Sequence, residues 1–401
     1  MEKAIFKIKG GRLVMKLLDV CEFIVDCPHS TAPDEGEGYP LIRTPNIGRG
    51  RLKLDNVHRV SKDVYDKRNK RAVPQVDDII FAREAPAGNA AIICDGQKVC
   101  LGQRTVLIRP DKNKVYPQYL VYYILAPQQQ YELLGTANGA TVAHVNIPVI
   151  KNLSIQLPEM DKQIKIANTI SSYEDLIENN QKQIKLLEEA AQRLYKEWFV
   201  DLRFPGYEDV AIVDGVPEGW KKETLIDIAD VIMGQSPKSE FYNTHREGLP
   251  FHQGVRSYGR RFVNDDVYST SYTRIAEKNS ILFSIRAPVG RLNITKNKIV
   301  IGRGLAAMKH KLGYQSYLFH MLKERFFKDN LVGNGAIFAS ITKNELLNQT
   351  FINPNEELIR KFNEIAKNVD DKINVLDSQT ELLKQARDRL LPKMMNGEIE
   401  V

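Results

Sequence analysis

The chain has 401 residues, of which 43% are hydrophobic and 27% are charged, and its formal net charge is +7. This composition predicts a globular protein with two or three domains, and the basic excess favours polyanionic partners. There is no run of eighteen apolar residues, which excludes a membrane-spanning helix. Lys7, Lys9 and Arg12 interrupt the apolar core that a signal peptide needs, so we expect a cytoplasmic protein without membrane association.

The chain contains two diverged copies of one domain. FAREAPAG at residues 81–88 returns as FSIRAPVG at 283–290, and LGQR at 101–104 returns as IGRG at 301–304. Equivalent residues are separated by 208 positions near Asp19 and by 196 near Pro158, so loops have changed length while the elements kept their order. Two copies are too few for a solenoid, and the sequence therefore predicts a tandem duplication. A further equivalent pair of segments is Asn138-Gly139-Ala140 and Asn334-Gly335-Ala336.

The first copy, residues 1–158, has the pattern of an α/β domain. A strand is predicted over 78–81, and the Ala-Pro-x-Gly turn after it combines the fixed φ of proline with a glycine that permits positive φ. One helix is predicted over 117–131 from its helical periodicity. The match between the copies begins only at Leu18, so we hypothesise that residues 1–14 are a dispensable extension and that Met15 is the functional start.

Basic and polar residues gather in the irregular stretches of the first copy. Arginine and lysine neutralise phosphates, and arginine, asparagine and glutamine make paired hydrogen bonds to base edges, as nucleic-acid recognition requires. For any single residue, a solvated charged loop is the alternative interpretation. The candidate DNA-binding residues of this copy are Arg43, Asn46, Arg49, Arg51, Lys53, Arg83 and Arg104.

All four cysteines, at positions 21, 27, 94 and 100, lie in the first copy. A domain that folds a second time without any cysteine does not need a disulfide or a structural zinc ion. Cys21 and Cys27 are also not at a usual zinc-ligand spacing. We therefore expect reduced, mostly buried thiols, no metal site and a reducing compartment.

The first copy leads into a long helix with its linker, residues 159–205. Residues 161–198 contain neither glycine nor proline, and apolar side chains recur with the seven-residue spacing of a coiled coil. Asn180 lies within this series, where a polar residue fixes register at some cost in stability. The predicted seam consists of Ile170, Ile177, Ile184, Leu187, Leu194 and Trp198.

The second copy, residues 206–353, repeats the pattern, with a strand predicted over 280–283 and a helix over 314–329. Its framework residues match the first copy, whereas its basic loops differ almost entirely. If these loops contact bases, the two copies recognise different sequences, so the target should be asymmetric and in two parts. The candidate DNA-binding residues of this copy are His252, Gln253, Arg256, Tyr258, Arg260, Arg261, Arg286 and Arg303.

A second long helix occupies residues 354–401, with a seam at Ile373, Leu376, Leu383 and Leu390. Its other seam series is weaker, because Thr380 and Arg387 interrupt it. A chain with two matched seams can satisfy both internally. We therefore predict an α/β protein whose two domains are separated by an antiparallel coiled coil of the two helices; the alternative is that the helices dimerise the chain.

The chain lacks the motifs of catalytic and nucleotide-binding sites. It has no Pro-Pro pair, which the Asp/Asn-Pro-Pro-aromatic loop of amino-methyltransferases requires, and no Gly-Lys pair for a phosphate-binding loop. His29, His58, His144 and His310 are scattered, and each is more often structural than catalytic. We expect no catalytic residues in this chain and no enzyme activity of its own.

Several phrases give the chain a family resemblance. They are IQLP at 155–158 before the first helix, WFVD at 198–201, FPGYE at 204–208 and PEGW at 217–220. Because of these sequence segments, residues 15–401 resemble the specificity subunit of type I restriction-modification systems. FINP at 351–354 departs modestly from its counterpart IQLP, which does not threaten the fold.

The resemblance implies a specificity subunit with two target recognition domains that bind an asymmetric, split target in double-stranded DNA. It implies that the helices recruit two adenine methyltransferase subunits, to which restriction and translocation subunits are added in a host-defence complex. S-adenosylmethionine, ATP and Mg²⁺ would be bound by those partners, so no cofactor is expected in this chain.

Two other interpretations remain open at the level of sequence. The first is a coiled-coil adaptor whose basic domains bind RNA or acidic proteins without sequence preference. The second is the specificity subunit of a methyltransferase-nuclease outside type I. Sequence preference that survives moderate salt would separate a sequence-specific DNA-binding protein from an adaptor.

Overall fold

The computed structural model describes residues 7–9, 12–135, 144–326 and 340–399. The chain forms two compact units, residues 1–180 with 379–401, and residues 181–378. Each unit thus combines one globular copy with one half of each long helix. The sequence analysis placed the domain boundaries at the ends of the two long helices. These boundaries of the globular domains stay a prediction.

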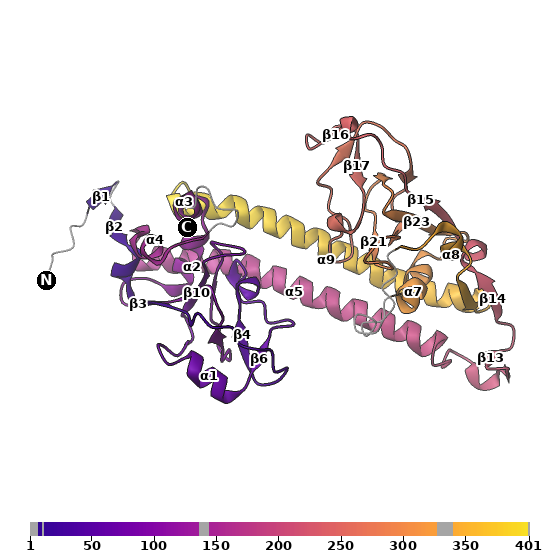
Figure 1. The fold of residues 1–401 in the computed structure, drawn as a ribbon, viewed down its shortest axis with the longest axis horizontal. Coiled ribbons are helices and arrows are strands. Elements are labelled where there is room, and N and C mark those ends of the chain that lie inside the picture. Colours follow the sequence, from indigo (N-terminus) through magenta and orange to yellow (C-terminus); the bar gives the residue numbers. More distant parts are fainter. Residues whose placement is uncertain (1–6, 10–11, 136–143, 327–339, 400–401) are drawn as a thin grey trace. The chain divides into compact units, whose positions relative to one another are not determined.

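The first globular copy is built on a five-stranded sheet with the order β3-β10-β7-β8-β5. Figure 1 labels two strands of this sheet, β3 and β10. All its pairs are antiparallel except β5 with β8. A smaller sheet, β6-β4-β9, pairs β4 with β9 in parallel. The strands are β3 (Cys21–Asp26), β4 (Tyr39–Ile42), β5 (Gly50–Arg51), β6 (Arg59–Val60), β7 (Ile79–Ala82), β8 (Ala90–Ile92), β9 (Cys100–Leu101) and β10 (Thr105–Pro110). A third sheet, β1-β2-β11, joins β1 (Lys7–Lys9), β2 (Arg12–Lys16) and β11 (Ser154–Leu157).

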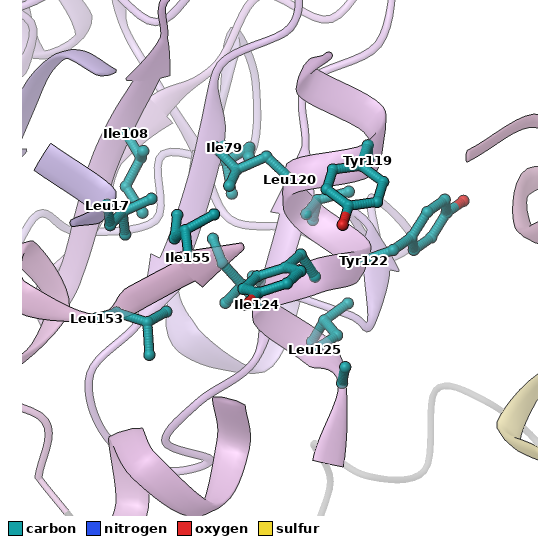
Figure 2. Close-up of a cluster of buried hydrophobic side chains, with 14 of the residues drawn as sticks. Leu17, Ile79, Ile108, Tyr119, Leu120, Tyr122, Ile124, Leu125, Leu153 and Ile155 are labelled. Atoms are coloured by element: carbon teal, nitrogen blue, oxygen red, sulfur yellow. The ribbon is translucent and has the colours of Figure 1, made fainter. Parts of the chain in front are cut away.

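The main sheet of this copy is covered by α2 (Pro117–Leu125), which is buried along almost its whole length. Figure 2 shows Tyr119, Leu120 and Ile124 of α2 among Ile79, Ile108 and Ile155 of the strands. Burying such side chains contributes roughly 1.5–3 kcal/mol each. Shorter helices are α1 (Lys62–Arg68), α3 (Pro127–Gly135) and α4 (Ile147–Asn152).

The single helix predicted over 117–131 is wrong, because two helices, α2 and α3, occupy this stretch. The break lies at Ala126, whose ψ of 147° is extended. Pro127 follows it, and the proline ring disfavours helical backbone at the residue before it. The residues around Asn138 and Asn334 that the sequence comparison matched lie outside the described part of the chain.

The second globular copy repeats this plan. Its main sheet has the order β15-β23-β20-β21, with β15 (Ala229–Met233), β20 (Ile281–Ser284), β21 (Leu292–Ile294) and β23 (Leu305–His310). A second sheet, β16-β18-β17-β22-β19, again holds one parallel pair, β17 with β22. Its strands are β16 (Tyr242–Asn243), β17 (Leu249–His252), β18 (Tyr268–Ser269), β19 (Ile275–Ala276) and β22 (Ile299–Ile301). The remaining elements are β12 (Ile212–Val213), β13 (Val216–Pro217), β14 (Lys221–Thr224), α6 (Leu225–Ile228), α7 (Gln315–Phe326), α8 (Lys343–Leu347) and β24 (Thr350–Asn353).

The repeated order of elements confirms the predicted duplication at the level of the fold. The turns after β7 and β20 match even in their cis peptide bonds, Ala85-Pro86 and Ala287-Pro288. The helix predicted over 314–329 is α7, and the last three predicted residues lie outside the described part.

The two long helices are α5 (Met160–Phe199) and α9 (Glu356–Asn396). In the first unit, Ile170 of α5 shares a core with Leu391 and Met394 of α9. In the second unit, Ile184 packs with Ile373 and Leu376. Trp198, near the end of α5, contacts Phe362, near the start of α9, with ring centroids 5.9 Å apart. Within each unit the helices are therefore antiparallel, as predicted.

The predicted seam is largely buried in both helices. Ile170, Ile177, Ile184, Trp198, Ile373 and Leu376 are buried, and Leu187, Leu194, Leu383 and Leu390 are half-buried. Arg387 interrupts the apolar seam of α9, and it forms an ion pair with Glu174 of α5 at 2.6 Å. Among the described residues, no helix is long and apolar enough to cross a membrane.

Candidate nucleic-acid interface

A short loop in each copy touches the long helices, and we call it the docking loop (residues 47–52 and 258–263). Both loops are closed by the same backbone hydrogen bond, from Gly48 to Arg51 and from Gly259 to Phe262, each 3.0 Å long. Both are also flanked by an isolated antiparallel bridge. The two docking loops are therefore equivalent elements of the duplicated fold.

In the first copy, the arginines of the docking loop are engaged inside the protein. Arg51 contacts Asp175 and donates to Glu178 at 3.0 Å, both on α5. Arg49 donates to the carbonyl oxygen of Leu125, at the end of α2, at 2.9 Å. These two predicted DNA-binding residues thus bind α5 and α2 in this structure.

In the second copy, Arg260 donates to Glu188 of α5 at 3.3 Å. Arg261 forms ion pairs with Asp370 of α9 and with Glu188, and its guanidinium lies over the Phe319 ring at 4.4 Å. Only 3% of the Arg261 side chain is exposed. The sequence analysis assigned all four docking-loop arginines to DNA binding. In the structure, three of them contact acids of the long helices, and Arg49 contacts only the end of α2.

Two more predicted residues are internal. Asn46 is buried, and its side chain accepts from the Arg43 amide at 3.1 Å and donates to the Lys53 carbonyl at 3.3 Å. His252 is buried between Ser257 and Asp265, at 2.7 Å and 3.0 Å. With both polar ends occupied, neither side chain is free for a base edge in this conformation.

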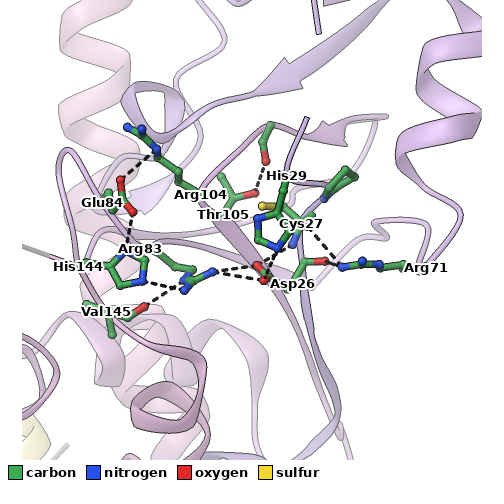
Figure 3. Close-up of polar contacts among 12 residues, drawn as sticks. Asp26, Cys27, His29, Arg71, Arg83, Glu84, Arg104, Thr105, His144 and Val145 are labelled. Atoms are coloured by element: carbon green, nitrogen blue, oxygen red, sulfur yellow. Dashed lines mark hydrogen bonds and ion pairs between the residues drawn. The ribbon is translucent and has the colours of Figure 1, made fainter. Parts of the chain in front are cut away.

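Arg83 belongs to a polar network, which Figure 3 shows. Its guanidinium lies 3.2 Å from Asp26, donates to the Val145 carbonyl at 3.0 Å and meets His144 at 2.8 Å. Arg104 joins the network through Glu84 at 3.0 Å, yet more than half of its side chain is exposed. Arg83 is therefore structural, whereas Arg104 remains reachable from solvent.

Tyr258 lines a cavity of about 480 Å³ beside Arg260 and Arg261. Its hydroxyl is buried and has no hydrogen-bond partner among the described residues, and burial raises its pKa. The other predicted residues face solvent wholly or in part. They are Arg43 and Lys53 in the first copy, and Gln253, Arg256, Arg286 and Arg303 in the second.

The solvent-facing residues of both copies include one repeated arrangement, which we call the polar corner. It lies at the end of the parallel pair β4 with β9 in the first copy and β17 with β22 in the second. It comprises the residue after the first strand of that pair (Arg43 or Gln253) and the loop after the second strand (102–104 or 302–304). In both copies a glycine amide closes the corner: Gly102 donates to the Ile42 carbonyl and Gly302 to the His252 carbonyl, each at 2.8 Å. Arg43 and Arg104 line one pocket of about 270 Å³.

Sequence analysis missed one residue of this arrangement. Gln103 lines the same pocket, and its amide donates to the His29 carbonyl at 2.8 Å. The alignment of the two copies could have identified Gln103, because it is equivalent to Arg303, which is a candidate DNA-binding residue of the second copy.

The cysteines do not contribute reactive groups. All four are free, and burial raises the pKa of the Cys21 thiol to about 12 and that of Cys100 to about 11. These thiols are therefore neutral at pH 7, in agreement with the predicted reduced, mostly buried cysteines. No group of three or more potential metal ligands occurs among the described residues.

Comparison with known proteins identifies the family of the chain. The family model described as the type I restriction modification DNA specificity domain matches residues 13–189 and, again, residues 217–386. This chain belongs to that family. Each matched segment holds one globular copy and part of the helix after it, so the two copies of the specificity domain confirm the tandem duplication.

Relatives of this specificity protein match over nearly its whole length. The MjaX specificity subunit of a type I restriction enzyme, from Methanocaldococcus jannaschii, is 29% identical over 401 residues, covering 97% of this chain and 93% of that protein. The MjaIX specificity subunit of the same organism is 27% identical over 421 residues, covering 100% of this chain and 96% of that protein.

The fold of the specificity domains is also found in a solved structure. The crystal structure of the type I restriction-modification S subunit from M. genitalium aligns with a TM-score of 0.57 at 16% identity. It covers 98% of this chain and 97% of that chain. This likeness shows that the two proteins share a fold.

Proposed function

We propose that this chain recognises a DNA target in two parts, one for each specificity domain, as the specificity subunit of a type I restriction-modification complex. The observation that supports this most is the polar corner, which both copies build with the same backbone but with different side chains. A shared framework with different exposed polar groups suits two domains that bind the same kind of ligand with different sequence preferences. The target is therefore asymmetric.

The docking loops indicate which part of each domain binds the long helices and which part is free for DNA. In each copy, arginines of the loop are engaged by acids of the long helices, for example Arg51 by Asp175 and Arg260 by Glu188. The globular domain is thereby fixed to its helices on one side. The polar corner, whose groups remain reachable from solvent, is left to contact DNA.

We propose that the helices recruit two copies of a methyltransferase subunit through a repeated exposed stripe. Leu186, Ala190 and Arg193 of α5 recur 196 positions later as Leu382, Ala386 and Arg389 of α9. Leu186 and Leu382 are 63% and 65% exposed, so neither contributes to the seam. Arg193 and Arg389 are exposed and have no ion pair among the described residues, which leaves each guanidinium available for a carboxylate of the partner.

We place catalysis on the partners. The methyltransferase subunits would bind S-adenosylmethionine, and restriction and translocation subunits would bind ATP and Mg²⁺. The site that this chain provides is for DNA, and its exposed groups suit binding more than bond-breaking chemistry. Four free cysteines suit a reducing compartment, so the complex is proposed to act in the cytoplasm.

Selection from random DNA tests the proposed function. The chain, assembled with its methyltransferase subunit, is expected to enrich two short conserved sequences separated by an unspecified gap, at salt near 150 mM. Enrichment without any sequence preference, or binding that disappears at this salt, would support the adaptor interpretation instead.

A further inference from the structure

We propose that each specificity domain recognises bases with the same two positions, and that the two domains carry the same pair of side chains in exchanged places. The pair is Arg43 and Gln103 in the first domain, and Gln253 and Arg303 in the second. This inference rests on the proposed function and adds to it which residues contact bases and which bases they prefer.

The equivalence of the positions follows from strand register. In the first domain, the parallel pair aligns Ile42 with Leu101, and in the second it aligns His252 with Ile301. The chain leaves the first strand of each pair at residue 43 or 253. It leaves the second strand through the glycine at 102 or 302. The residues that follow these glycines, Gln103 and Arg303, are therefore matched in space as well as in sequence.

The glycines bring the two positions of each pair together. A Cβ on Gly102 would lie 3.0 Å from Cγ of Arg43, and one on Gly302 would lie 3.1 Å from Cγ of Gln253. Both distances are at the short limit for such contacts, so a larger residue would push the two chain segments apart. This close approach gives a physical reason for the glycine that both copies share.

The side chains at the four positions keep groups for a ligand. Gln103 donates one amide N–H to the His29 carbonyl at 2.8 Å, which leaves its second N–H and its Oε1. Gln253 and Arg303 are exposed, and Arg43 and Gln103 are half-buried in the same pocket. The Arg43 Nε is buried and has no hydrogen-bond partner among the described residues.

The backbone around these side chains is held in both domains. The buried Asn46 accepts from the Arg43 amide at 3.1 Å, and the Gln253 carbonyl accepts from Gly304 at 3.0 Å. Arg104 is not part of the repeated pair, because its counterpart Gly304 has no side chain.

The chemistry of the pair predicts the bases. Arginine makes two parallel hydrogen bonds to the O6 and N7 atoms of guanine, and glutamine makes two to the N6 and N7 atoms of adenine. Each half of the target should therefore contain one guanine and one adenine contacted by this pair. Because the side chains are exchanged, their order along the domain should be reversed between the two halves.

A reciprocal exchange tests the inference. Arg43→Gln with Gln103→Arg gives the first domain the arrangement of the second, without changing charge or composition. With the methyltransferase subunit present, selection from random DNA should show the guanine and adenine of the first half exchanged and the second half unchanged. Because both base contacts are mismatched, binding to the original target should fall by at least about 30-fold.

The matched control is Lys53→Gln, which removes an exposed charge outside the pair. It should weaken binding to all sequences alike and leave both halves of the selected site unchanged. The exchange variant should unfold at the same temperature as the parent, because both exchanged positions reach solvent. If the parent selects a two-part site and the exchange variant selects the identical site, the assignment of this pair is wrong, whereas a parent that selects nothing contradicts the proposed function.

Discussion

Arg261 and Asp370 form an ion pair that is buried inside the second unit, although 109 positions separate them in the chain. The pair joins the second docking loop to α9. Burial raises the pKa of Asp370, and the charge of Arg261 acts against this shift. Removing the arginine would leave a largely buried carboxyl group, with 20% of the Asp370 side chain exposed, without its main cation.

We therefore predict that Arg261→Ala lowers the free energy of unfolding by about 3 to 5 kcal/mol. The matched control is Arg256→Ala, on an exposed arginine of the same irregular stretch, which should change it by less than about 0.5 kcal/mol. Urea denaturation followed by circular dichroism measures both variants. Equal effects in the two variants would show that the docking loop does not hold the domain.

The coiled-coil seam allows a second comparison between neighbouring positions. Ile184 is buried against Ile373 and Leu376, whereas Leu186 is largely exposed. Ile184→Asp should cost at least about 3 kcal/mol, because its carboxylate has no partner in the seam. Leu186→Asp should cost less than about 0.5 kcal/mol. Thermal unfolding of both variants decides this, and a soluble Ile184→Asp protein of parental stability would refute the seam assignment.

The repeated stripe predicts the number of partners. Leu186→Asp and Leu382→Asp should each remove one of two bound methyltransferase subunits, weakening that site at least about tenfold, and the double variant should bind none. Native mass spectrometry of the complexes counts the subunits. Leu176→Asp is the control, since Leu176 is also exposed on α5 but its equivalent in α9 is Lys372. Two subunits on every variant would place the contact elsewhere.

The buried His310 predicts an acid-sensitive second domain. Burial lowers its pKa from 6.5 to about 4, and its Nδ1 accepts from the Leu312 amide at 3.1 Å, which needs a neutral ring nitrogen. Because the pKa is lower in the folded state, the unfolded chain binds a proton first. The contribution of His310 to stability is therefore complete above pH 6.5 and is lost as the pH falls towards 4.

His310→Asn keeps an acceptor for the Leu312 amide but cannot be protonated. The stability of the parent should fall relative to this variant by up to about 3 kcal/mol between pH 7 and pH 4. Unfolding curves at several pH values test this. Parallel stability profiles for the two proteins would mean that His310 does not titrate on unfolding.

The duplication and the helices could be predicted from the sequence because their signals are local. The seven-residue spacing around Ile184 predicts which face of α5 is buried. The FAREAPAG segment aligns without gaps with FSIRAPVG in the second copy. The same reasoning failed at Ala126, where the apolar period continues through a proline that ends α2.

The roles of the basic residues could not be predicted in the same way. Arg51 and Arg261 look like free loop arginines until their partners are known, and these acids lie 124 and 109 positions away. Only the tertiary fold separates an arginine that binds a helix from one that is available to DNA. The comparison of copies did carry one usable signal, since Gln103 aligns with Arg303.

The most direct test of the account compares two double variants, each altered in one domain. Arg43→Ala with Gln103→Ala changes the first polar corner, and Gln253→Ala with Arg303→Ala changes the second. The parent and both variants, each assembled with the methyltransferase subunit, are subjected to selection from random DNA. We predict that each variant loses sequence preference in one half of the target, a different half for each, and keeps the other half intact. Loss of both halves in either variant, or an unchanged selected site in both, would contradict the assignment of one half of the target to each domain.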